Sequence, residues 1–255
     1  MAVTFDPTSS QYLSNGPVHD LPDLCSISLW MQTPDWASLR IMLGRVDGGG
    51  SKGWAIEGAA TDDSIIRTYQ SGYAQDHVVG AYSANTWVHL LWIHKYVSGV
   101  GGYERLIKNG GSPVDQGDKA TTPLATNKLF IGAWNNDGTA QFYWKGKIAE
   151  VAIWDNADLE SHKGDLYTQA ATGKAANHSD ILITPTYYWS LDNKITADIG
   201  GSGVDLMNNN SCAVASHVAD SLTIARSSGS IAPLSSIKMV RPPGSLIRPS
   251  GFGRK

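Results

Sequence analysis

Two tryptophans in polar stretches are the residues of this 255-residue chain best suited to binding a ligand. An exposed indole offers a flat apolar surface on which a sugar ring can stack, and neighbouring amides and carboxylates can bind the sugar hydroxyls. The predicted ligand-binding residues are Trp36, Trp134, Asn135, Asn136 and Asp137. The alternative is that both indoles pack down as lids over the core.

The same polar stretch supplies oxygen ligands of the kind that calcium prefers. The candidate ligands are Asp47 and Asp137, together with Asn135 and Asn136. Asn and Asp are also the ordinary residues of solvated turns. We therefore favour a turn, keep calcium as the alternative, and assign no metal-binding residue and no other cofactor.

Carboxylates and histidines give little sign of catalysis. Glycoside hydrolysis needs two carboxyl groups flanking one bond, but Glu150 and Asp155 are five residues apart and face opposite sides of a regular strand. We expect Glu150 at the surface or facing a hairpin, and no catalytic residue. His89 and His94 also point to opposite faces, whereas zinc ligands converge. The protein is predicted not to be an enzyme, with a glycoside hydrolase using Glu150 as a weaker alternative.

The composition, 42% hydrophobic and 17% charged, is that of a globular chain long enough for one core. The most apolar run, residues 87–97, contains two histidines and a lysine and is too short to cross a bilayer. The first Lys or Arg is Arg40, so no secretory signal or mitochondrial presequence is recognised. We expect synthesis in the cytoplasm and no membrane partner, with an extracellular location as the alternative.

Short apolar runs of period two, separated by Gly, Asn, Asp and Pro, extend from about residue 25 to residue 225. This pattern is typical of half-buried antiparallel strands. The run 87–94 is apolar on both faces and is predicted to be central, and Asn109-Gly110 predicts a hairpin turn. Other expected strands are 25–31, 129–134, 147–154, 187–191 and 204–207.

One helix is predicted, from about residue 158 to residue 171, because its apolar residues fall at helical spacing. The predicted fold class is all-β, a two-sheet antiparallel jelly-roll sandwich with one short helix and an extended C-terminal arm.

Cys25 and Cys212 fall in the first and last predicted strands, where a disulfide is conceivable. Two buried free thiols are favoured because no export signal is seen.

The last thirty residues differ from the rest of the chain. Residues 226–255 contain four Pro, four Gly and seven Ser, and carry a charge of +6 against −9 for residues 1–225. The charges are interleaved with apolar residues, which favours an extended arm on an acidic protein groove over a nucleic-acid contact. The predicted contact residues of this arm are Arg226, Lys238, Arg241, Pro242, Pro243, Arg248, Phe252, Arg254 and Lys255.

Six segments in sequence order carry a family resemblance. They are 5–13, 25–30, 86–89, 108–110, 129–132 and 144–154, and residues 188–192 resemble the closing strand. Together they resemble the laminin-G-like, concanavalin A-type jelly roll over about residues 1–220. The resemblance implies a mostly non-enzymatic binder of carbohydrate or protein, and similar domains occur in phage virion proteins.

Two functions follow from these observations. The first is a non-enzymatic virion structural protein, either a capsid decoration (cement) component or another part of the virion surface. Its arm would become ordered only on a capsid or other virion protein, with homo-oligomeric contacts. The second is a carbohydrate-binding module or adhesin that uses Trp36 and Trp134 to bind a surface glycan.

Overall fold

The structure is a computed structural model, and the residues that it describes are 2–15, 22–35, 40–46, 53–59, 64–70, 73–98, 100–117, 128–136, 138–171, 184–191 and 205–215. The predicted arm at 226–255, and its boundary with the domain, lie outside these ranges. The boundary at residue 225 therefore stays a prediction.

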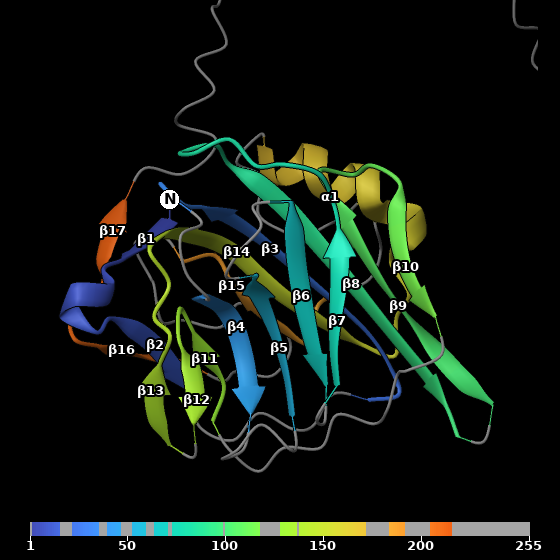
Figure 1. Ribbon diagram of the computed structural model, residues 1–255, viewed down its shortest axis with the longest axis horizontal. Coiled ribbons are helices and arrows are strands. Elements are labelled where there is room, and N and C mark those ends of the chain that lie inside the picture. The colour runs from blue at the N-terminus through green and yellow to red at the C-terminus, as the bar shows by residue number, and fades with distance from the viewer. Residues whose placement is uncertain are drawn as a thin grey trace, which may run out of the picture. The chain divides into compact units, whose positions relative to one another are not determined.

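One of two antiparallel sheets, sheet A, has eight strands in the described part of the chain (Figure 1). They are β1 (Ala2–Phe5), β3 (Leu24–Gln32), β8 (Val88–Val97), β9 (Gly101–Lys108), β10 (Pro113–Gly117), β14 (Gly146–Asp155), β15 (Tyr187–Trp189) and β17 (Ala213–Ala215). Their order across the sheet is β10-β9-β8-β3-β14-β1-β17, with β15 also paired to β14.

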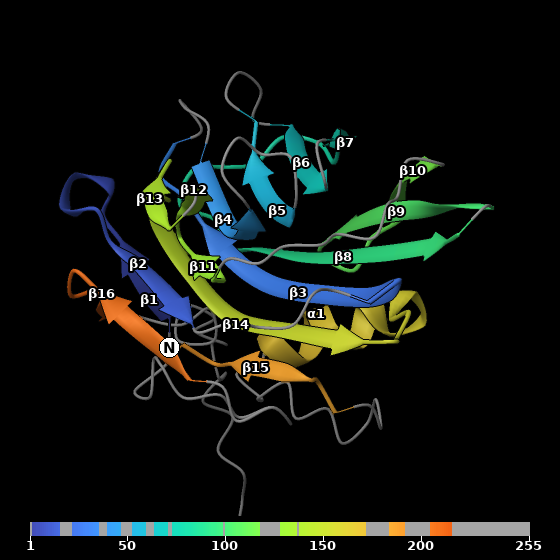
Figure 2. The ribbon, with the colours of Figure 1, turned by 90° about the horizontal axis from the view of Figure 1, so that it is seen from below.

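The second sheet, sheet B, has seven described strands and lies against sheet A as a separate layer (Figure 2). Its order is β16-β2-β11-β4-β5-β6-β7. The bounds are β2 (Tyr12–Asn15), β4 (Arg40–Val46), β5 (Gly53–Gly58), β6 (Ile65–Gln70), β7 (Tyr73–Val78), β11 (Phe130–Ile131) and β16 (Leu206–Asn209). A separate hairpin joins β12 (Trp134–Asn136) to β13 (Thr139–Gln141). The two-sheet jelly-roll prediction is confirmed.

The core between the sheets is built from the inward-facing residue of every second position. Trp54 on β5 and Trp92 on β8 meet across it, with ring centroids 6.1 Å apart. Strand β8 is buried on both faces, as predicted, because Leu91 and Ile93 pack on the far side of sheet A. The predicted turn after β9 is also present, since Asn109 and Gly110 both have positive φ.

Strands begin earlier than the sequence pattern predicted. β1 and β2 precede Cys25, and Val3 on β1 pairs with Ile148 on β14. Each of these strands has four residues, too few for a clear period-two signal. Cys25 is therefore in the third strand and Cys212 lies between β16 and β17; both thiols are free and buried, as favoured.

A β-bulge divides β14 at Glu150. The register with β3 shifts between Ala149 and Ala152, and Glu150 has φ of 52°. Before the bulge β14 pairs with β1, and after it β14 pairs with β15. The extra residue thus lies where the strand exchanges one neighbour for another.

The predicted helix is present as a 3₁₀ turn, η3 (Glu160–His162), followed by α1 (Lys163–Ala171). A second 3₁₀ turn, η1 (Pro7–Ser9), follows β1. Figure 2 shows α1 on the side of sheet A away from sheet B. Tyr167 stacks on Trp30 at 5.5 Å and Leu166 packs beside Trp154, so α1 covers part of that face. No helix among the described residues is long and apolar enough to cross a membrane.

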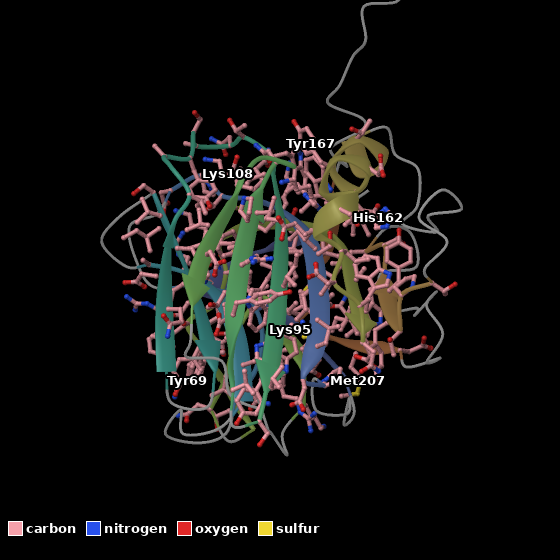
Figure 3. All side chains as sticks on the ribbon, turned by 90° about the vertical axis from the view of Figure 1, so that its right-hand side faces the viewer. Tyr69, Lys95, Lys108, His162, Tyr167 and Met207 are labelled. Atoms are coloured by element: carbon pink, nitrogen blue, oxygen red, sulfur yellow. The ribbon has the colours of Figure 1, made fainter. Side chains whose placement is uncertain are left out.

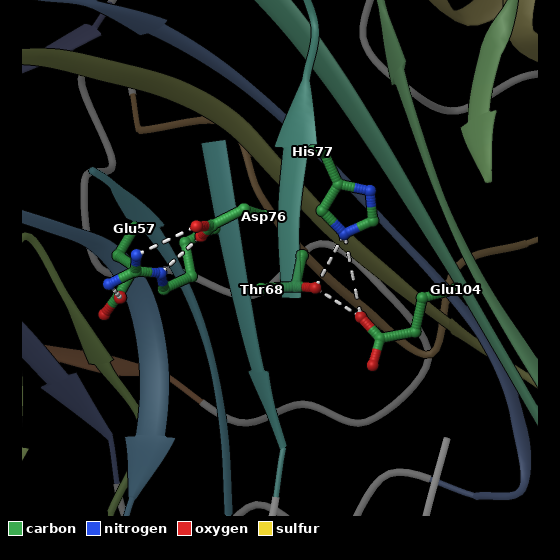
Figure 4. A network of polar contacts seen from close by, with 6 residues as sticks. Glu57, Thr68, Asp76, His77 and Glu104 are labelled. Atoms are coloured by element: carbon green, nitrogen blue, oxygen red, sulfur yellow. Dashed lines mark hydrogen bonds and ion pairs between the residues drawn. The ribbon is translucent and has the colours of Figure 1, made fainter. Parts of the chain in front are cut away.

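A buried polar cluster joins the two sheets at the side where β7 approaches β10 (Figure 4). We call Thr68, His77 and Glu104 the inter-sheet clasp; all three are at most 1% exposed. The Thr68 hydroxyl donates to Glu104, and His77 Nε2 lies 2.8 Å from the same hydroxyl. His77 Nδ1 lies 3.3 Å from the carbonyl of Val114, which can only accept. These hydrogen bonds give each polar group of the clasp a partner inside the sandwich, where an unpartnered polar group would be costly.

His94, next to the clasp on β8, gives a prediction about acid stability. Burial lowers the pKa of His94 to about 4, although Glu104 and Asp23 act in the opposite direction. The unfolded chain therefore binds the extra proton more readily, so the stability that depends on a neutral His94 is complete above about pH 6.5 and is lost as the pH decreases toward 4. We expect protonation of His94 to cost about 2 kcal/mol between pH 7.5 and pH 5. Buried Glu57 acts in the opposite direction over this range, because burial raises its pKa to about 7.

Urea unfolding of wild type and His94→Gln at both pH values measures this loss. Relative to wild type, His94→Gln should gain about 2 kcal/mol of stability on going from pH 7.5 to pH 5, whereas His162→Gln, at a partly exposed residue on η3, should show the same pH dependence as wild type. An unchanged slope in His94→Gln would show that another group titrates.

Candidate functional site

Trp134 lies on the outer face of sheet B, the face away from sheet A. Its ring packs against a small apolar cluster of Ile41, Val46 and Ala55 and meets the ring of Tyr69 edge-on, with centroids 5.5 Å apart and planes at 73°. Both rings are half-buried, so part of each remains exposed. Figure 3 shows Tyr69 beside sheet B, away from Tyr167 on α1. We call Trp134 and Tyr69 the aromatic platform.

Small residues make room for the platform. Gly44 on β4 pairs with Ala55 on β5, and a Cβ at Gly44 would lie only 2.8 Å from the Cβ of Ala55. Gly132, just before Trp134, has φ of 85° and would place a Cβ 2.5 Å from the ring of Phe5. The chain therefore turns away from β11 at Gly132 and enters the β12–β13 hairpin.

The predicted neighbours of Trp134 have different environments. Asn135 is 1% exposed; its amide donates to the carbonyl of Lys128 at 2.7 Å and its Oδ1 accepts the Gly138 N–H at 2.7 Å. This side chain braces the hairpin. Asn136 is half-buried and pairs with Thr139. The predicted polar loop is thus a short hairpin, in which Trp134 and Asn135 are strand residues.

Trp36 and Asp137 lie outside the described residues, as does Asp47 of the calcium hypothesis. The residue before Trp36 is held from two sides: Asp35 pairs with Arg40 at 2.8 Å and with Lys145 at 2.5 Å. Within the described ranges, no three His, Cys, Asp or Glu side chains converge in a way that could hold a metal ion.

A row of charged side chains crosses the same outer face, next to the platform. Glu57, Arg67 and Asp76 are paired neighbours on β5, β6 and β7. Arg67 Nε lies 2.5 Å from Asp76 Oδ1, and Arg67 Nη1 lies 3.6 Å from Glu57 Oε1. Arg67 and Tyr69 are two residues apart on β6, so they share a face. We call these three residues the charged row.

Burial distinguishes the two carboxyl groups of the row. The Glu57 side chain is 5% exposed and that of Asp76 is 46% exposed. Desolvation raises the pKa of Glu57 to about 7, although the nearby Arg67 lowers it. Glu57 therefore changes charge near neutral pH. In Figure 4 the charged row and the inter-sheet clasp lie on opposite sides of β6, as successive residues of a strand must.

The sequence reasoning did not find the charged row, because the run 53–78 was not recognised as strands. One signal was available: Arg67 and Tyr69 alternate with Ile66 and Thr68. Such alternation marks a strand with one polar face. What places Glu57 and Asp76 beside Arg67 is strand pairing, which a single sequence does not show.

Glu150 differs from its expected surface position. It is 8% exposed, lies in the bulge of β14, and accepts a hydrogen bond from the hydroxyl of Tyr188 on β15. The expectation assumed a regular strand, whereas the extra residue breaks the alternation and turns Glu150 toward the outer face of sheet A, where Tyr188 lies.

His89 also lies on the outer face of sheet A and bonds Ser28 at 2.8 Å, while His94 points into the core. The two histidines therefore point to opposite faces, as expected.

Another hollow lies in the described part of the chain, at the start of α1. A pocket of about 530 Å³ is lined by Asp158, Glu160, Ser161 and Lys163 at the start of α1. Its acids are already engaged, because Asp158 accepts the Tyr103 hydroxyl at 2.6 Å and Glu160 pairs with Arg105 at 2.7 Å. These contacts attach η3 to β9. The aromatic platform and charged row therefore remain the stronger candidate.

A comparison with protein families identifies the family to which this chain belongs. The family model described as the concanavalin A-like lectin/glucanases superfamily matches residues 7–161. The chain belongs to this superfamily. The laminin-G-like resemblance drawn from the sequence is thereby confirmed. A search of curated proteins finds no match.

Solved structures agree with a lectin/glucanase-like fold. A putative carbohydrate binding protein from Bacteroides ovatus aligns with a TM-score of 0.58 and 14% identity over 83% of this chain and 58% of that protein. A heptameric SAP-like pentraxin from Limulus polyphemus aligns with a TM-score of 0.52 and 12% identity over 84% of this chain and 97% of that one. The present chain thus spans little more than half of the Bacteroides protein, and at these identities the likeness concerns the fold.

The bond between Tyr188 and Glu150 gives a prediction for this lectin/glucanase-like domain. Tyr188→Phe removes one donor from a buried carboxylate, so we expect a loss of about 1–3 kcal/mol in unfolding free energy. Tyr143→Phe is the matched control, because its hydroxyl donates only to the carbonyl of Ala140 at the hairpin. Chemical denaturation compares the two; equal stability would show that this bond does not hold the bulge.

Proposed function

We propose that this domain binds a saccharide on the outer face of sheet B. The observation that carries the proposal is the aromatic platform next to the charged row. A sugar ring stacked on Trp134 would lie on the face that carries the charged row, where the Asp76 carboxylate is 46% exposed and accepts hydrogen bonds. The carbohydrate-binding description of the Bacteroides protein supports the same class of ligand.

We propose binding without hydrolysis. The carboxyls of Glu57 and Asp76 come from strands on either side of β6, and Arg67 pairs with both. A sugar undergoing hydrolysis would need the space between two carboxyls that the guanidinium occupies. Glu150 lies in the bulge on the other sheet, in contact with Tyr188. These arrangements support a binding module rather than a glycoside hydrolase.

A glycan array with Trp134→Ala tests the binding site. Wild type should bind at least one glycan class, and the variant should bind it at least about tenfold more weakly because the stacking surface is lost. Tyr103→Ala is the control, since Tyr103 is a half-buried aromatic on the outer face of sheet A, beneath Arg105. An array blank for wild type contradicts the proposal, as does unchanged binding by Trp134→Ala. Release of reducing sugar from the bound glycan would contradict binding without hydrolysis.

We also propose, from the charge distribution of the sequence, that residues 226–255 attach the domain to a virion or another assembly. The arm carries +6, which suits an acidic groove on a partner. Such a protein would be made in the host cytoplasm and carried on the virion surface; a binding module acting alone would be extracellular.

Deletion of residues 226–255 separates the two roles. The truncated protein should keep its unfolding transition and its glycan binding but lose incorporation into particles, measured by co-sedimentation with purified particles. A variant with Arg241, Arg248 and Arg254 changed to Gln should reduce incorporation in the same direction, because the positive charge is lowered. Full incorporation of the truncated protein would show that the arm is not the anchor.

A further inference from the structure

The charge of the candidate site indicates which saccharides it takes. Arg67 is the base of the charged row, and it is already shared: Nε and Nη2 bond the two oxygens of Asp76 at 2.5 and 3.1 Å, and Nη1 lies 3.6 Å from Glu57. With both acids ionised, the row has a net charge of −1. The more exposed member is Asp76, so a ligand beside the platform meets a carboxylate first.

We infer that this site binds uncharged saccharides and excludes glycans that carry carboxylate or sulfate groups. The inference rests on the proposed saccharide site and names its ligand class. An anionic group near Asp76 would meet a like charge, while the guanidinium that could neutralise it is already paired. At contact distance in water such a repulsion amounts to roughly fivefold in affinity, and to more where the groups are partly buried.

The burial of Glu57 makes this exclusion depend on pH. Glu57 is faced by Ile41 on β4 and Arg67 on β6, with Asp76 beyond it on β7. Because its pKa is raised to about 7, Glu57 is mostly ionised at pH 8 and mostly protonated at pH 6. The row changes from −1 to neutral as the pH falls. Acidic glycans should therefore be excluded more strongly at pH 8 than at pH 6.

The experiment compares pairs of oligosaccharides that share a core and differ by one carboxylate or sulfate, starting from any glycan bound on the array. At pH 8 wild type should bind the neutral member at least about fivefold more tightly than the acidic member. Asp76→Asn should remove most of this difference. Asp115→Asn, at a similarly exposed carboxylate paired with Arg105 on sheet A, should leave it unchanged. Glu57→Gln should remove the change between pH 6 and pH 8.

Equal or tighter binding of the acidic members by wild type would overturn the inference while leaving the saccharide site in place. A difference that persists unchanged in both Asp76→Asn and Glu57→Gln would also overturn it, because the charged row would not be its source. An array that stays blank, or binding untouched by Trp134→Ala, overturns the proposed site itself and this inference with it.

Discussion

The alternation of side chains along each strand, one toward the partner sheet and the next away from it, governs what every part of this protein can do. Inward positions are filled by large apolar residues such as Trp54 and Trp92, whose burial between the sheets supplies the main driving force for folding. Outward-facing side chains do not pack between the sheets, so they can contact a helix or remain partly exposed. On sheet A they receive α1, and on sheet B they carry the aromatic platform and the charged row.

Polar groups that enter the interior obey a stricter condition, because each must find a partner there. The inter-sheet clasp meets it by placing Thr68 between His77 and Glu104, so that hydrogen bonds join polar side chains of the two sheets. This bridge lies beneath the charged row, on the other side of β6. Strand β6, which carries Arg67 and Tyr69 on its outer side, is thus held on its inner side by the hydrogen bonds of Thr68.

The outer face of sheet B carries two half-exposed aromatic rings and, beside them, two carboxyl groups that share a single guanidinium. In the proposed site, aromatic stacking would favour any sugar face, whereas the charged row would distinguish among sugars by their own charge. Small residues at Gly44 and Ala55 allow the rings to approach the strands closely. Geometry and charge together therefore suit a polyol without an acidic group.

Much of this fold was encoded in local pattern. The central strand β8, the turn at Asn109-Gly110, the helix near residue 163 and the two-sheet class all follow from periodicity and turn chemistry, which act between near neighbours in the chain. The polar neighbours of Trp134 also indicated that its ring is not fully buried, and it is half-buried. What local pattern could not decide was pairing: the short β1 strand against β14, the bulge that buries Glu150, and the meeting of Glu57 with Arg67 and Asp76. Those contacts depend on which strands become neighbours, and that choice is made by the packing of the whole sandwich.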